Sequence, residues 1–240
     1  MKIEASLLKR FIKKASLNGR NMAINMDFTD TGIQSAIKGI TGTSLTKTFL
    51  KQEAFEDYEN IGEIFIKNTL MFLKYLDSFK GIIEMNKSED TENILVLSDQ
   101  NREGFIILGD EIVCENVYRD EFPAYQTVLT VNLTKADLVR ALGDLSLLKT
   151  THVVIEKITD KLSFEIGNKN ESDYFKNIID IEDSVGTARV KIADSIIDLY
   201  ASLDSDFELK LGNDMPVICN EITEFIDYTC VIAPLTEGGD

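Results

Sequence analysis

The feature of this sequence that most constrains its fold is one pattern of elements that occurs twice, on either side of a connector near the middle of the chain. A short strand, an amphipathic helix, alternating strands, a second helix and further strands follow one another in residues 1–117, and the same order recurs in residues 128–240. The residues between them, 118–127, are charged, contain Pro123 and interrupt both patterns. With 240 residues, the chain is long enough for two domains that each bury a core. We therefore predict an α+β protein of two similar domains joined by a short connector.

Each half is expected to hold two helices and several strands. Asn18 and Gly19 are typical of a helix end, and Thr134 with Asp137 forms the S/T-x-x-D pattern of a helix start. Alternating apolar and polar residues, clearest in residues 206–211, indicate half-buried strands. The helices are predicted at about residues 6–17, 68–79, 134–147 and 193–203.

The first predicted helix separates apolar from basic side chains. At 100° per residue its apolar side chains fall on one side, and the other side carries only cations. The ordinary alternative is a solvated face of mixed charge, but this face holds no anion, which favours contact with a polyanion. The apolar set is Leu7, Leu8, Phe11, Ile12 and Ala15, and the basic set is Lys9, Arg10, Lys13 and Lys14.

The charge of the whole chain limits what kind of polyanion contact is possible. The net charge is −16, and a uniformly acidic surface repels DNA, so binding by simple counterion release should be weak. Residues 1–120 hold 15 basic and 19 acidic side chains, against 10 and 22 in residues 121–240. A phosphate-facing surface would therefore be carried mainly by the first half of the chain.

Few residues are available for metal or nucleophilic chemistry. Three cysteines without a CxxC spacing are expected to be buried free thiols. His152, the single histidine, stands where a strand begins and is expected at a strand edge. A zinc site or a Ser-His-Asp or Cys-His site would depend on this one residue, so we expect no metal and no cofactor.

The sequence also carries an expectation about location. No stretch approaches 18 uncharged apolar residues, and the first residues contain no apolar segment of a signal peptide. We expect an intracellular protein of the cytoplasm, nucleoid or nucleus of the host cell, neither secreted nor bound to a membrane.

Several motifs, in order and spacing, match a known family. The most specific are DMPVI at residues 214–218 and YTCVIAP at residues 228–234. Others are LLKR at 7–10, TGIQS at 31–35, and an F-x-x-Y segment at 55–58 that precedes the second helix. Across essentially the whole chain, the sequence resembles the sliding clamps of the proliferating-cell-nuclear-antigen (PCNA) type, the DNA polymerase processivity factors of eukaryotes, archaea and some viruses.

The resemblance implies a DNA clamp fold in which each domain packs two helices on antiparallel sheets, and it implies a ring. Such clamps are usually homotrimers that a clamp loader closes around duplex DNA, with helices lining the hole. Topology then holds the ring on DNA, and its contacts with phosphates need no sequence specificity. The partners implied are DNA polymerase, the clamp loader and other replication and repair proteins whose aromatic-containing peptides bind a pocket under the connector.

The resemblance also assigns roles to particular positions. The residues implied to face DNA are Lys9, Arg10, Lys13, Lys14, Lys74, Lys80 and Arg140. Those implied for the partner-peptide pocket are Ala36, Ile40, Thr41, Phe122, Pro123, Pro216, Val231, Ala233 and Pro234. Edge-to-edge strand pairing between subunits would use Phe105, Ile107, Tyr174 and Ile178.

One helix departs from the family pattern and keeps alternatives open. The fourth predicted helix places Asp194 and Asp198 on its polar side, where family members often carry cations. A clamp-like protein that is monomeric, dimeric or hetero-oligomeric is therefore one alternative. A cytoplasmic hydrolase with a carboxylate-bound metal is another, although the repeat and the scarcity of histidine disfavour it.

Overall fold

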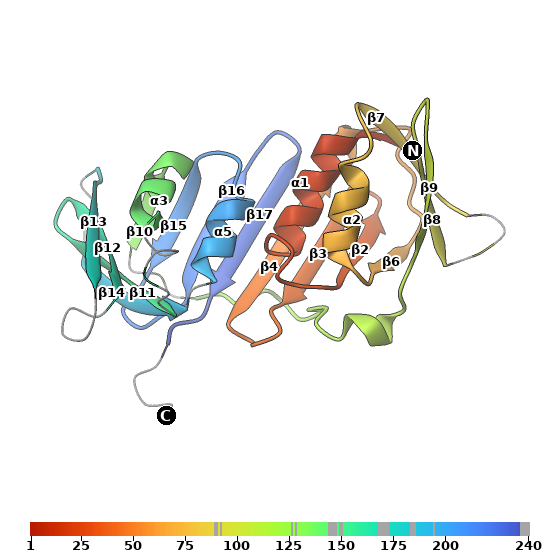
Figure 1. Ribbon diagram of the computed structural model, residues 1–240. Coiled ribbons are helices and arrows are strands. Elements are labelled where there is room, and N and C mark those ends of the chain that lie inside the picture. The colour runs from red at the N-terminus through yellow and green to blue at the C-terminus, as the bar shows by residue number, and fades with distance from the viewer. Residues whose placement is uncertain are drawn as a thin grey trace. The chain divides into compact units, whose positions relative to one another are not determined.

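The computed structural model describes residues 1–88, 91, 93–125, 127, 129–143, 148, 151–167, 173–182, 186–193 and 195–235 (Figure 1). The chain divides into two compact units. Unit 1 comprises Met1–Ile40, Thr46–Arg119 and Thr223–Tyr228, and unit 2 comprises Thr41–Leu45, Asp120–Ile222 and Thr229–Asp240. The main division, between Arg119 and Asp120, falls inside the segment predicted to be the connector. Two short segments do not follow this division: Thr41–Leu45 belongs to unit 2, and Thr223–Tyr228 belongs to unit 1.

Unit 1 contains two helices and antiparallel strands. Its five-stranded sheet has the order β5-β1-β7-β8-β9, and strands β4, β3, β2 and β6 lie side by side in a second sheet. The elements are β1 (Lys2–Glu4), α1 (Ala5–Ala15), β2 (Ile24–Thr29), β3 (Gly32–Lys38), β4 (Ser44–Lys51), β5 (Phe55–Glu56), β6 (Glu63–Ile66), α2 (Thr69–Leu76), β7 (Ile82–Lys87), β8 (Ile94–Ser98) and β9 (Glu103–Ile107), with short 3-10 turns at Gln52–Ala54 and Glu111–Cys114.

The described part of unit 2 also consists of helices and antiparallel strands. Its four-stranded antiparallel sheet has the order β13-β12-β11-β14, and β10, β15 and β16 pair in a second sheet. The elements are β10 (Leu129–Leu133), α3 (Lys135–Leu142), β11 (His152–Ile158), β12 (Lys161–Gly167), β13 (Tyr174–Asp180), β14 (Ala188–Ala193), α5 (Ile196–Ser202), β15 (Phe207–Leu211) and β16 (Val217–Ile222). Strand β17 (Ile226–Ile232) belongs to unit 1 up to Tyr228 and to unit 2 from Thr229. The predicted α+β class with antiparallel sheets is confirmed. No helix among the described residues is long and apolar enough to cross a membrane.

Helix α1 forms where its amphipathic pattern predicts. Leu8, Phe11 and Ile12 are completely buried, so its apolar side packs into the core of unit 1. The helix ends where the Ser16 hydroxyl donates to the Ile12 carbonyl oxygen at 2.7 Å, and Gly19 then adopts a φ of +86°, which favours glycine. Helices α1 and α2 lie side by side (Figure 1).

Helices α2 and α3 begin at residues whose side chains cap them. The Asn68 side chain accepts a hydrogen bond from the Met71 amide at 2.9 Å at the start of α2. The capping box predicted at Thr134 and Asp137 is present at the start of α3. Helix α5 is shorter than predicted and begins after Ser195. Residues 144–147 of the third predicted helix, and Asp194, lie outside the described residues.

Candidate functional site

The basic side of α1 is smaller than the sequence predicts. Arg10 and Lys13 are half-buried, and the ammonium group of Lys9 donates to the carboxylate of Asp77, just beyond α2. Arg10 and Lys13 interact with other groups as well. Three cations therefore remain at the surface of this helix.

Lys14 was wrongly predicted to face DNA. It is completely buried, and its ammonium nitrogen lies 5.2 Å from the centroid of the Tyr228 ring. On the helical wheel Lys14 lies next to Leu7, at the boundary between the basic and apolar sides, and its long aliphatic stem can extend along the core. The residue therefore belongs to the packing of unit 1.

Helix α2 exposes a mixed surface. Lys74 is exposed, as is Lys80 in the turn that follows, and no ion pair among the described residues includes either of them. Beside Lys74, however, the helix also exposes Met71 and Tyr75, at 49% and 44%. The sequence indicates no role for these two residues, because helical periodicity alone does not show which apolar positions are left uncovered.

The helices of unit 2 offer fewer cations. Arg140 on α3 is exposed, but its guanidinium lies 3.1 Å from the carboxylate of Asp137, which also caps the helix. Helix α5 carries Asp198 and has no lysine or arginine. A contact with phosphates would therefore depend mainly on unit 1.

The two strands predicted to join subunits are both edge strands. Strand β9 ends the five-stranded sheet of unit 1 and exposes Phe105 and Ile107, at 60% and 62%. Strand β13 ends the four-stranded sheet of unit 2, exposes Ile178 at 51% and leaves Tyr174 half-buried. An edge strand presents unpaired backbone groups that another chain can use, so both strands are suited to pairing.

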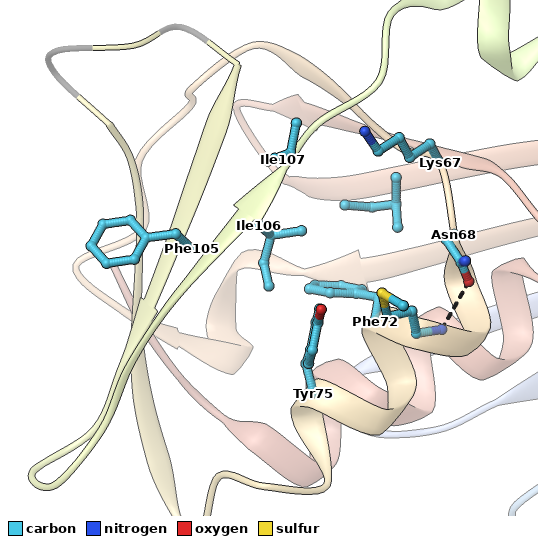
Figure 2. Close-up of a pocket in the computed structure, with 9 residues that line it drawn as sticks. Lys67, Asn68, Phe72, Tyr75, Phe105, Ile106 and Ile107 are labelled. Atoms are coloured by element: carbon cyan, nitrogen blue, oxygen red, sulfur yellow. Dashed lines mark hydrogen bonds between the residues drawn. The ribbon is translucent and has the colours of Figure 1, made fainter.

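An apolar pocket lies beside the β9 edge, between this strand and α2 (Figure 2). Its volume is about 190 Å³. Figure 2 shows Ile106 pointing toward Phe72, whereas Phe105 points away from α2. The lining residues are Ile66, Lys67, Asn68, Met71, Phe72, Tyr75, Phe105, Ile106 and Ile107. The pocket and the edge together form an apolar surface that could receive side chains of another chain.

Strand β13, the edge strand of unit 2, is held by polar contacts to its neighbours. The ammonium of Lys176 lies 2.8 Å from the Glu165 carboxylate on β12. Burial opposes ionisation of Glu165, but the hydrogen bond and charge of Lys176 outweigh it and lower the pKa of this carboxyl group. The Asn177 amide donates to the Ala141 carbonyl oxygen at 2.9 Å, which ties β13 to α3. The strand is therefore fixed in position while Ile178 remains exposed.

The residues predicted for the peptide pocket fall in both units. Ala36 and Ile40 belong to unit 1, where Ile40 is 66% exposed, and the others belong to unit 2. In unit 2, Phe122 and Pro123 are half-buried, and Val231 is buried, which makes it a core residue of this chain rather than a contact surface.

The end of the described chain is held by backbone pairing. The Ala233 amide donates to the Thr43 carbonyl oxygen at 2.8 Å, and Thr41 lies exposed in the same segment. Pro234 pairs with Ile192 on β14, whereas Pro216 is half-buried in the β15–β16 connection. Contact of these residues with a peptide stays a prediction.

The cysteines are core residues, and the histidine begins a strand. Cys114, Cys219 and Cys230 are buried, and none of them forms a disulfide bond, as expected. His152 is half-buried in the first position of β11, where burial and the charge of Lys191 lower its pKa. Within the described ranges, no group of three potential metal ligands was found.

Comparison with known proteins identifies the fold. No family model matches the sequence, and no curated protein matches it. Solved structures do match, over nearly the whole chain: the two units have the fold of the DNA sliding clamps, which confirms the predicted fold.

Three of the matching structures are clamps of the PCNA type. PCNA from Entamoeba histolytica has a TM-score of 0.80 at 19% identity, covering 98% of each chain. A. fulgidus PCNA, solved with the C-terminal region of FEN-1 bound, has a TM-score of 0.81 at 16% identity, covering 99% of this chain and 98% of that one. PCNA from Thermococcus kodakaraensis has a TM-score of 0.81 at 18% identity, covering 98% of this chain and 99% of that one.

Proposed function

We propose that this protein is a DNA sliding clamp: a non-enzymatic processivity factor that encircles duplex DNA and tethers replication and repair proteins. The observation that carries the proposal is the match of the fold to three PCNA structures over at least 98% of the chain. This function would place the protein with DNA inside the cell, in the cytoplasm, nucleoid or nucleus.

The charges of unit 1 support contact with DNA. Lys9, Arg10 and Lys13 lie on one helix, and Lys74 and Lys80 lie on or just after the neighbouring one. These cations can contact phosphates without reading bases, which is what a sliding ring requires. Because the net charge of the whole chain is −16, its overall field would repel DNA away from these cations.

The two edge strands support self-association. If β9 of one subunit pairs with β13 of the next, the unpaired backbone N–H and C=O groups of both edges form hydrogen bonds with each other. The same pairing buries the side chains of Phe105, Ile107 and Ile178. Because the two edges differ, such contacts are head-to-tail and generate a ring when the rotation closes. We propose a homotrimer, with the α2–β9 pocket receiving apolar side chains from the neighbouring subunit.

The partners proposed are a DNA polymerase, a clamp loader and other proteins with aromatic-containing peptides. One matching PCNA was solved with the C-terminal region of FEN-1 bound, which supports peptide tethering by this fold. In this chain, Phe122 and Pro123 of the connector and the segment around Ala233 and Pro234 are the proposed contact residues. An aromatic side chain buried there would contribute about 2 kcal/mol.

The test is the mass in solution, measured by light scattering over a hundredfold range of concentration. Three chains of 27.0 kDa give a ring of about 81 kDa. A mass near this value, with retention on closed circular DNA and release after the DNA is linearised, supports the clamp. A chain that stays at 27.0 kDa and is not retained on circular DNA would contradict it.

A second candidate is a clamp-like protein that is monomeric or dimeric or that joins different subunits. It is favoured by the lack of cations on α5 and by the pairing of Arg140 with Asp137, because a homotrimer would repeat these features around the hole. Light scattering also tests this candidate, since a 27.0 kDa species that assembles only with another protein would support it.

A further inference from the structure

A second, polar pocket lies in unit 1, where two turns that are distant in the sequence meet. Its volume is about 610 Å³. One turn follows α2 and includes Lys80, and the other joins β8 to β9 and includes Arg102. The lining residues are Ser78, Lys80, Gly81, Ile82, Asp99, Gln100, Asn101 and Arg102.

Buried contacts fix the two turns relative to each other. Phe79 is 7% exposed, and its ring lies 3.4 Å from the position that a Cβ atom on Gly104 would occupy. Gly81, at a φ of +72°, accepts a hydrogen bond from the Ala5 amide at 2.9 Å, which ties the first turn to the start of α1. The pocket is therefore formed before any ligand binds.

The β8–β9 turn is closed by its own hydrogen bonds. The Asp99 amide donates to the Arg102 carbonyl oxygen at 2.9 Å. One carboxylate oxygen of Asp99 accepts from the amides of Asn101 and Arg102, both at 2.8 Å. The one carboxylate that lines the pocket therefore caps its own turn, and the Arg102 side chain is held on a rigid support.

The electrostatics of the pocket favour an anion. Two cations and one carboxylate line it. Lys80 and Arg102 are exposed, and none of the ion pairs found in the described part of the chain includes either of them. The side-chain amides of Gln100 and Asn101 add neutral hydrogen-bond donors. A guanidinium group with an ammonium nearby is the donor set that suits a phosphate oxyanion.

We propose that this pocket binds a phosphate of the DNA backbone, with Arg102 and Lys80 as its two cationic ligands. The inference rests on the proposed function and extends it, because the pocket lies just after α2, the helix that carries Lys74. With Lys74 of α2 and Lys80 and Arg102 of the pocket, the phosphate-facing surface would extend from the helices to the β8–β9 turn.

The test compares charge reversals at the pocket with one elsewhere in unit 1. Arg102→Glu, Arg102→Ala and Lys80→Glu are measured against Lys47→Glu, which reverses an exposed lysine on β4. Binding of a fluorescein-labelled duplex is followed by anisotropy over a salt series that begins at low ionic strength. The slope of log affinity against log salt should fall by about one for each phosphate that the variant no longer neutralises, and Lys47→Glu should leave it unchanged.

The outcomes separate this inference from the proposed function. In one outcome, the Arg102→Glu and Lys80→Glu variants bind DNA as the Lys47→Glu variant does, while the double variant Lys9→Glu with Lys13→Glu loses binding. The pocket is then not a DNA site, and the clamp proposal stands. If inorganic phosphate shifts the amide resonances of Asn101 and Arg102 but DNA does not, the DNA assignment is overturned. Arg102→Ala removes the guanidinium without adding an anion, and circular dichroism confirms that each variant is folded.

Discussion

The ammonium nitrogen of Lys14 lies 5.2 Å from the centroid of the Tyr228 ring, and both residues are buried in unit 1. A lysine ammonium over an aromatic face is attracted by the negative potential of the ring. This contact joins the last turn of α1 to residues 223–228, the late segment of the chain that belongs to unit 1. A residue that the sequence pattern assigned to DNA contact is thus part of the core.

We therefore expect Lys14 variants to lose stability rather than DNA binding. Lys14→Ala removes a buried aliphatic stem and should lower the free energy of unfolding by about 2 kcal/mol, measured by urea denaturation. Lys14→Met keeps most of the packing and serves as the control, with a smaller loss. A Lys14→Ala protein of unchanged stability but weaker DNA affinity would restore the sequence-based assignment.

The exposed residues of β9 should control assembly. Ile107→Asp places a carboxylate in the proposed β9–β13 contact, where burying it without a partner is costly, and should shift the mass from about 81 kDa toward 27.0 kDa. Ile222→Asp introduces the same change at another residue that is 76% exposed, and should leave the mass unchanged. Equal masses for the two variants would argue against β9 as the contact strand.

The elements of this fold could be predicted because their patterns are local. The apolar side of α1 and the capping box at Thr134 follow from spacing alone, and both are present in the structure. Lys14 could not be placed in the same way, because at the boundary of a helical face the neighbouring element decides burial. The motifs at the end of the chain indicated the clamp fold, which no single element specifies.

The pockets could not be predicted, because each combines segments that are distant in the sequence. Arg102 lies in a turn without periodicity, and Phe79 packing near Gly104 brings it to the turn that holds Lys80. Met71 and Tyr75 follow a normal amphipathic pattern, and only the position of β9 shows that they border an open pocket.

Tyr58 should make stability depend on pH in the alkaline range. Its hydroxyl lies 2.8 Å from the carbonyl oxygens of Thr29 and Gly32, and burial, with the charges of Asp27 and Asp30, raises its pKa from 10.0 to about 12. Because the folded state holds the hydroxyl proton more tightly than the unfolded state, Tyr58 contributes to the free energy of unfolding. This contribution is fully present below pH 10 and is lost as pH rises from 10 to 12.

The Tyr58→Phe variant isolates this effect. It lacks the titrating hydroxyl, so the difference in unfolding free energy between wild type and variant should shrink between pH 10 and 12. Urea denaturation at a series of pH values measures this difference. A difference that stays constant across the range would show that Tyr58 titrates alike in the folded and unfolded states.

Phe122 should contribute to partner binding through the connector. Phe122→Ala removes a half-buried aromatic side chain and should weaken an aromatic-containing clamp-binding peptide by about 2 kcal/mol, or roughly thirtyfold in Kd, in a calorimetric titration. Tyr125→Ala truncates another half-buried aromatic of the same connector and is expected to have a smaller effect. Unchanged affinity for Phe122→Ala would show that the connector does not cover the peptide.

The surface cations of α1 should matter for DNA but not for the fold. Arg10→Glu with Lys13→Glu reverses two half-buried cations on the side of the helix opposite Leu8 and Ile12, so the core stays intact. We expect loss of polymerase stimulation on primed DNA with little change in the urea midpoint, because reversed charges repel phosphates and make each passage of the duplex unfavourable. The control is the double variant Lys38→Glu with Lys47→Glu, which makes the same change in charge on β3 and β4 and should stimulate the polymerase as wild type does.

Full stimulation by the α1 variant would show that α1 is not part of the DNA-facing surface. The cations of that surface in unit 1 would then be Lys74, Lys80 and Arg102.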